Sequence, residues 1–154
     1  MSATPSAPHP ETPRFIAAVV YPNEHYPQAV FEGFVRHCRD RKLRMAGVLQ
    51  HPSCAPDAHH CDIVLEDLAD GSRTPIFESR GAAARGCRLD SAALADVTGR
   101  LAAAMQCDPD ILLLNKFGKV EAEGGGLVDL IGEAVARQVP AVIAVPQRNL
   151  AAWR

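Results

Sequence analysis

The sequence lacks any apolar run long enough to cross a bilayer, and it contains few aromatic residues. No stretch approaches the roughly 20 consecutive apolar residues of a transmembrane helix. The first residues also lack the basic-then-apolar order of a secretory signal. We therefore expect a cytoplasmic protein that does not insert into membranes. Because 47% of the residues are hydrophobic but only 5% are aromatic, the core must be largely aliphatic, which favours an α/β fold.

The sequence also lacks an excess of charge of either sign and a regular cysteine pattern. A formal net charge of -2 gives no reason to expect a nucleic-acid partner, and arginines cluster only at Arg80, Arg85 and Arg88. The cysteines are odd in number and include no C-x-x-C pair: they are Cys38, Cys54, Cys61, Cys87 and Cys107. This spacing indicates free thiols rather than a disulfide framework or a zinc knuckle.

The chain divides into a short tail and one domain. Residues 1–14 hold four prolines among Ser, Ala and Thr, so they are predicted to form a disordered tail. Residues 15–154 are numerous enough to bury a sizeable single core, and they show no internal repeat. We therefore expect a single domain over residues 15–154.

Within that domain, apolar runs alternate with segments of helical periodicity. Buried strands are predicted at 15–21, 43–50, 111–114 and 139–145. Helices are predicted at 29–42, 91–107 and 127–137, the second capped by Asp90 or Ser91. The runs 62–68 and 73–77 flank an Asp-Gly pair, which is typical of a β-hairpin. The order predicts a three-layer α/β fold with a mainly parallel sheet and an added hairpin.

Apolar positions within the predicted helices indicate which faces are buried. The inward residues expected for the first helix are Ala29, Val30, Phe34, Val35 and Cys38. Those expected for the last helix are Leu127, Leu130, Ile131, Ala134 and Val135. These faces would cover the sheet.

The densest group of charge and glycine follows the apolar run 111–114. It contains Asn115, Lys116, Lys119 and Glu121 and ends in three glycines. In open α/β sheets, ligands bind beyond the carboxyl ends of the strands, so this turn is the predicted site. Arg148 and Asn149 follow the final strand and are expected on the same rim if the two strands are parallel.

The order of segments resembles a family of small P-loop nucleoside triphosphatases, the cancer-related or thermophilic nucleotide phosphatase-kinases. The matching pieces lie at 47–49, 61–71 and 114–121, and Gly118-Lys119-x-Glu121 is the most specific of them. The resemblance implies a P-loop-like fold. However, residues 21–28 stand where the Walker A loop would be and contain no glycine, lysine, serine or threonine. Asn115-Lys116 also replaces the acidic pair of the Walker B strand, so Mg²⁺-dependent triphosphate hydrolysis is not expected.

A closer resemblance is to a bacterial family of unknown function that itself looks like a degenerate P-loop protein. Three segments are similar: R-G-x-x-x-R-G-C-R-L-D at 80–90, N-K-F-G-K-x-E-A-E-G-x-G at 115–126, and V-P-x-R-N-L-x-x-W at 145–153. Members of that family occur near molybdate-transport genes. The resemblance implies a role in molybdenum homeostasis.

These observations favour binding or handling of a small oxyanion of the molybdate or tungstate class in cytoplasmic metal homeostasis, without Mg²⁺-dependent triphosphate hydrolysis. The predicted ligand-binding residues are Arg80, Arg85, Arg88, Asn115, Lys116, Lys119, Arg148 and Asn149. The alternative without a binding function is a solvated surface on which Lys116 and Lys119 pair with Glu121 and Glu123. One functional alternative is a nucleotide-binding or nucleoside-triphosphatase-like enzyme with Glu121 as its base. Another is a regulatory partner of a molybdate transporter or a cofactor-synthesis enzyme, and a homo-oligomer is a further alternative.

Two groups of residues carry metal-binding chemistry. Cys87 lies between Gly86 and Arg88, where nearby guanidinium groups would favour a thiolate able to bind a soft metal; a small buried side chain is the alternative. Ligand-type residues also gather in the segment 51–61: His51, Cys54, His59, His60 and Cys61. Their spacing fits no known zinc finger, so an incidental loop is the favoured interpretation.

Overall fold

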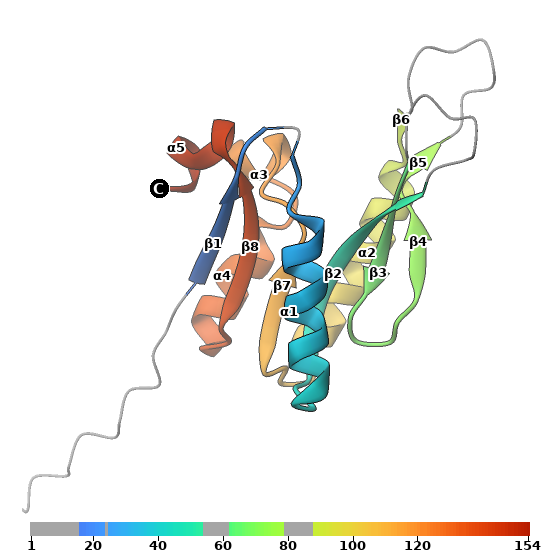
Figure 1. The fold of residues 1–154 in the computed structure, drawn as a ribbon, viewed down its shortest axis with the longest axis vertical. Coiled ribbons are helices and arrows are strands. Elements are labelled where there is room, and N and C mark those ends of the chain that lie inside the picture. Colours follow the sequence, from blue (N-terminus) through green and yellow to red (C-terminus); the bar gives the residue numbers. More distant parts are fainter. Residues whose placement is uncertain (1–15, 24, 54–61, 79–87) are drawn as a thin grey trace, which may run out of the picture.

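The computed structural model describes residues 16–23, 25–53, 62–78 and 88–154, which form a mixed α/β fold on a six-stranded sheet (Figure 1). The strand order is β1-β8-β7-β2-β3-β4. The strands are β1 (Ile16–Tyr21), β2 (Met45–Ser53), β3 (Asp62–Asp67), β4 (Arg73–Pro75), β7 (Ile111–Leu114) and β8 (Ala141–Pro146). The first four strands in this order are parallel, while β3 and β4 are antiparallel to their neighbours. The predicted α/β class, the mainly parallel sheet and the hairpin are therefore confirmed, whereas the predicted tail lies outside the described residues.

Helices cover both faces of the sheet. Helix α1 (Gln28–Asp40) lies in front of it in Figure 1, and α2 (Ser91–Met105) and α4 (Val128–Arg137) lie behind it. Three short helical segments, α3 (Lys119–Ala122), η1 (Gln147–Asn149) and α5 (Leu150–Trp153), gather at the end of the sheet where β1 and β8 finish. None of the three was predicted from sequence. Among the helices in the described ranges, none is long and apolar enough to cross a membrane.

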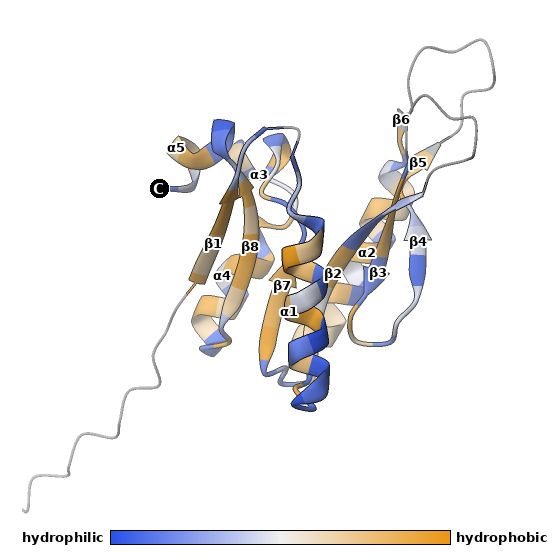
Figure 2. Ribbon diagram, in the orientation of Figure 1, coloured by the Kyte–Doolittle hydropathy of each residue, from blue (hydrophilic) through white to orange (hydrophobic). Residues whose placement is uncertain are grey.

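Side chains alternate along each strand, so the sheet separates two hydrophobic clusters. In β7, Leu112 and Leu114 pack with α2 and α4, whereas Ile111 and Leu113 pack with α1. The same alternation in β8 divides Ile143 from its neighbours. Figure 2 shows the consequence, because β1, β7 and β8 are hydrophobic along most of their length. Burial on both faces explains why these strands read as unbroken apolar runs.

Gly47 allows β2 and β7 to approach each other. Its φ is +121°, and a Cβ placed there would lie 1.8 Å from the backbone oxygen of Leu113 on β7. Only glycine fits this position without moving backbone. The glycine inside an otherwise apolar strand is therefore required by the pairing of the two strands.

Local sequence also explains where the helices begin and which side they bury. The Oδ1 of Asp90 accepts a hydrogen bond from Ala93 N at 2.9 Å, which confirms the predicted cap of α2. In α1 the buried residues are Phe31, Val35 and Cys38, so the predicted inward positions of Ala29 and Val30, both exposed, were wrong. Val135 of α4 is likewise 49% exposed. These errors arise because apolar residues also occur on solvated helix faces.

Two strand boundaries differ from the prediction. Strand β2 continues through Ser53, so His51 lies in a strand paired with Val64 rather than in a loop. Beyond the main sheet, β5 (Phe77–Glu78) pairs with β6 (Arg88–Leu89) in a short antiparallel ladder. Both extensions depend on pairing between distant segments, which local residue patterns do not reveal.

Candidate functional site

Segments following the carboxyl ends of β1, β7 and β8 meet at one edge of the sheet. They enclose a hollow of about 180 Å³, here called the basic hollow, which is lined by Tyr21, Tyr26, Gln50, Ile63, Lys116 and Arg148. Lys116 follows β7 and Arg148 follows β8, and these strands are parallel. The structure therefore brings these two predicted residues together, as the sequence analysis expected. No carboxylate is among the described residues that line this hollow.

The two tyrosines that line the basic hollow pack against each other, and Tyr26 also packs against α1. The ring of Tyr26 stacks on Phe31 at 5.6 Å and meets the ring of Tyr21 edge-on at 5.5 Å. The Tyr26 hydroxyl is buried and has no hydrogen-bond partner among the described residues. Burial, and to a lesser degree the neighbouring Tyr21, raises the pKa of Tyr26 well above its ordinary value. Tyr26 is therefore a neutral hydroxyl that can donate a hydrogen bond.

Tyr26 was not among the residues predicted to bind a ligand. One available signal was that the chain contains two tyrosines, and both flank the turn after the first strand. A buried tyrosine hydroxyl usually has a hydrogen-bond partner. A buried hydroxyl without one, on a residue that lines a hollow, is therefore a candidate ligand contact. Only the structure shows that this hydroxyl is buried.

The loop between β7 and α4 is organised by Glu121. Its Oε2 accepts a hydrogen bond from Gly118 N at 2.9 Å, and its Oε1 accepts one from Leu127 N at 3.3 Å. At Gly126, where φ is +59°, a Cβ would lie 2.4 Å from Oε1. The Gly118-x-x-Glu121 spacing and the glycine run thus have a conformational reason. With both oxygens accepting backbone amides, the geometry favours a structural role for Glu121 over that of a general base.

The carboxyl-terminal segment fastens the same loop. The side-chain amide of Asn149 donates to the backbone oxygen of Phe117 at 2.8 Å, and the ring of Phe117 packs edge-on against Trp153 at 5.3 Å. Phe117 N also donates to Ala144 O at 2.7 Å. Asn149, predicted to contact the ligand, therefore holds the backbone next to Lys116. This link explains how two distant sequence segments share one site.

Of the other predicted ligand residues, those that the structure describes do not line the basic hollow. Asn115 Nδ2 donates to Gln50 Oε1 at 3.3 Å, beside the basic hollow. The Lys119 side chain is 88% exposed and lies 4.0 Å from Glu123, as the solvated-surface alternative proposed for this lysine. Arg88 contributes backbone to β6. Arg80, Arg85 and Cys87 lie outside the described residues.

A second hollow of about 230 Å³, here called the apolar hollow, was not anticipated from the sequence. It lies next to the basic hollow, between the sheet, α2 and the loop after β7. Most of the side chains lining it are aliphatic, including Val48, Ile63, Leu65, Leu94, Val97 and Leu127. Gln50, Ile63 and Lys116 line both hollows. No single segment carries a pattern for this surface, because it is assembled from residues far apart in sequence.

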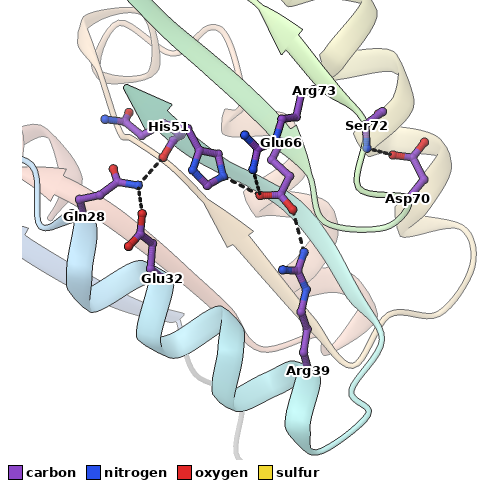
Figure 3. A network of polar contacts seen from close by, with 9 residues as sticks. Gln28, Glu32, Arg39, His51, Glu66, Asp70, Ser72 and Arg73 are labelled. Atoms are coloured by element: carbon purple, nitrogen blue, oxygen red, sulfur yellow. Dashed lines mark hydrogen bonds and ion pairs between the residues drawn. The ribbon is translucent and has the colours of Figure 1, made fainter. Parts of the chain in front are cut away.

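His51, one of the proposed metal ligands, instead pairs with a buried carboxylate. Its Nε2 lies 2.6 Å from Glu66 Oε2, and Arg39 Nη2 lies 2.9 Å from Glu66 Oε1 (Figure 3). Arg73 Nη2 is 3.9 Å from the same carboxylate. Burial by itself raises the pKa of Glu66, but the hydrogen bonds from Arg39 and His51 outweigh it and lower the pKa below its ordinary value. This set, Glu66 with Arg39, His51 and Arg73, is called the Glu66 cluster below.

The described part of the chain holds no group of three or more His, Cys, Asp or Glu residues arranged for a metal ion. The remaining members of the proposed group, Cys54, His59, His60 and Cys61, lie outside the described residues. Of the cysteines that are described, Cys38 is buried and Cys107 exposed, and both are free thiols. Burial raises the pKa of the Cys38 thiol, which fits a packing role.

Comparison with known proteins places these features in a family. A family model described as "Protein of unknown function (DUF2478)" matches residues 16–154. The chain is also 32% identical over 143 residues to a protein of Bradyrhizobium diazoefficiens named "Molybdenum import ATP-binding protein ModC 2". That alignment covers 92% of this chain but only 16% of the relative. No solved structure matches.

Proposed function

The chain belongs to the DUF2478 family of proteins of unknown function, and we propose that it binds a small oxyanion of the molybdate or tungstate class in the basic hollow. The observation that carries this proposal is that Lys116, Arg148 and Tyr26 line the same hollow. Two cations and a neutral donor suit a tetrahedral anion, which offers acceptor oxygens in several directions. The proposed ligand contacts are therefore two charge-assisted hydrogen bonds and one from a phenol.

Protonation favours the same ligand class. The raised pKa of Tyr26 keeps its hydroxyl protonated at neutral pH, so the ring brings a donor and not a negative charge. The absence of a carboxylate among the described lining residues avoids repulsion of an anion. An oxyanion would also supply the acceptor that the buried Tyr26 hydroxyl otherwise lacks among the described residues.

Similarity to part of a protein named for molybdenum import supports molybdate or tungstate over other oxyanions. Because the matched region is a small share of that relative, the transport activity of the whole relative is not transferred. We propose instead an accessory role, in which this domain senses or holds the transported anion. The α/β sheet with a glycine-rich turn after β7 is further proposed to derive from a P-loop fold that lost its phosphate loop.

Calorimetric titration tests the proposal directly. Molybdate, tungstate, sulfate and inorganic phosphate would be titrated into the wild type, Lys116→Ala and Arg148→Ala. Each substitution is expected to weaken molybdate binding by about tenfold or more, because each removes a hydrogen bond to a charged group. Arg36→Ala is the matched control, since it removes one positive charge from an exposed position on α1. Unchanged affinity in the Lys116→Ala, Arg148→Ala double variant would reject the site.

A second candidate, nucleotide binding, is favoured by the name of the relative, an ATP-binding protein. Against it, residues 21–28 lack the glycines, lysine and hydroxyl that hold a triphosphate and its Mg²⁺. Titration with ATP and GTP distinguishes the two: heat with nucleotide but not with molybdate supports this alternative. Binding of neither class favours the third reading, a regulatory partner of a transporter or of a cofactor-synthesis enzyme.

A further inference from the structure

The apolar hollow is unexplained by a free oxyanion. An oxyanion held by Lys116 and Arg148 would occupy the basic hollow and leave the adjoining apolar hollow unfilled by any described side chain. Leaving apolar surface hydrated forgoes the stabilisation that burial provides. Leu65 on β3 and Val97 on α2 belong to the main hydrophobic cluster, and Leu94 on α2 packs against it. All three also line the apolar hollow. A ligand with an apolar part would complete that packing.

Building on the proposed oxyanion site, we propose that the same site also binds organic oxyanions, in which a phosphate-like group is attached to a hydrophobic ring. The charged group lies in the basic hollow, and the ring lies in the apolar hollow. Lys116 is at the junction, because it lines both. The free oxyanion then occupies only one half of the site.

Size supports one ligand spanning the two hollows. Small-molecule sites are generally about 300 to 1,000 Å³. The hollows measure about 230 and 180 Å³, so each alone is below that range and the pair together is within it. The three shared lining residues make them neighbours on one surface rather than separate sites.

The polar groups near the apolar hollow favour a hydrophobic ring over a strongly polar one. The Thr98 hydroxyl already donates to Leu94 O at 2.9 Å, and the Glu121 oxygens accept backbone amides. Gln50 is held at the junction, with its side-chain oxygen accepting from Asn115 and its backbone oxygen accepting from Gln28. Apart from Lys116 and the exposed Lys119, few polar side chains remain to recognise a substituted base, so the ring would bind by burial.

Three probes separate the contributions of ring and charge: inorganic phosphate, 2-naphthyl phosphate and neutral 2-naphthol. Their affinities would be measured for the wild type, Leu94→Trp, which fills the apolar hollow, and Ala95→Trp, which places the same ring on the exposed side of α2. Thermal unfolding without ligand verifies that each variant folds. For the wild type, 2-naphthyl phosphate is expected to bind about tenfold more tightly than phosphate. Leu94→Trp should abolish that difference and retain phosphate binding, whereas Ala95→Trp should retain both.

The other outcomes distinguish a failure of the organic-ligand proposal from a failure of the oxyanion site. Equal affinity of phosphate and 2-naphthyl phosphate, or insensitivity of their difference to Leu94→Trp, overturns the organic ligand and leaves the oxyanion site intact. If 2-naphthol binds as tightly as 2-naphthyl phosphate and phosphate does not bind, the oxyanion site fails, and the spanning ligand fails with it. Should Leu94→Trp unfold, Val97→Phe fills the same hollow and gives the same readout.

Discussion

The Glu66 cluster and the basic hollow are both groups of charged side chains on the same sheet, but they are arranged differently. In the Glu66 cluster, a carboxylate that is 8% exposed is surrounded by Arg39, His51 and Arg73 (Figure 3). In the basic hollow, Lys116 and Arg148 line one opening beyond the strand ends, with no carboxylate among the described lining residues. The comparison teaches that a carboxylate buried beneath α1 needs cations beside it, whereas Lys116 and Arg148 lie at strand ends that stay partly open to solvent.

The largest expected effect is on the basic hollow. Arg148→Glu replaces an attractive charge by a repulsive one, so molybdate affinity should fall by about 100-fold or more. The free energy of unfolding should change little, because the residue is exposed. Calorimetry and denaturant unfolding measure the two quantities. A large loss of stability with unchanged molybdate affinity would show that Arg148 stabilises the fold and does not bind the anion.

The Glu66 cluster should respond in the opposite way. Glu66→Gln removes the buried negative charge and leaves Arg39 and His51 facing a neutral amide. The free energy of unfolding is expected to fall by about 1–3 kcal/mol, since Arg39 and His51 lose a charged hydrogen-bond partner. Molybdate affinity should be unchanged. Denaturant unfolding measures the first effect, and reduced affinity in a fully folded variant would show that the groups are coupled.

The acid dependence of stability should also come from the Glu66 cluster. Because the pKa of Glu66 is lower in the folded chain than its ordinary value of 4.5, the folded state favours the ionised carboxylate. Its contribution is therefore present above the unfolded pKa and is lost as the pH falls through the lowered folded pKa. Unfolding measured from neutral pH down into this acidic window should show a steeper loss for the wild type than for Glu66→Gln. Parallel curves would exclude Glu66 as a source.

The smallest expected effect concerns Tyr26. Tyr26→Phe removes one neutral hydrogen-bond donor from the basic hollow, so molybdate affinity should fall by about threefold to tenfold. Stability should be equal or slightly higher, because the buried hydroxyl has no partner among the described residues. Calorimetry and thermal unfolding check both values. An unchanged molybdate affinity would show that Tyr26 does not contact the anion, which would leave Lys116 and Arg148 as its proposed contacts.

Most elements of the fold were predictable because their signals are local. The unbroken run at 111–114 becomes β7, buried on both faces, and Asp90 caps α2 as expected. The extension of β2 and the β5/β6 ladder were not predictable, because they depend on partners far away in sequence. The inward face of α1 was predicted only in part: Val35 and Cys38 are buried as expected, whereas Val30 is exposed and Phe31, which was not predicted, is buried.

The site was predictable in part for the same reason. Lys116 and Arg148 each follow a predicted parallel strand, so their common edge could be inferred. The structural assignments of Asn149 and Glu121 depend on hydrogen bonds to particular backbone groups, which residue type does not specify. Tyr26 and the apolar hollow were missed since burial and cavity shape arise only from packing.

The sequence by itself determined the α/β alternation, the buried strands, the helix cap and the collection of cations after the strands, because these follow from periodicity and residue chemistry within short segments. The tertiary structure alone decided which cations share a hollow, which carboxylate is neutralised and where an apolar opening remains. These features depend on distances between residues up to 125 positions apart in the chain, such as Asn23 and Arg148, and folding brings such residues into contact.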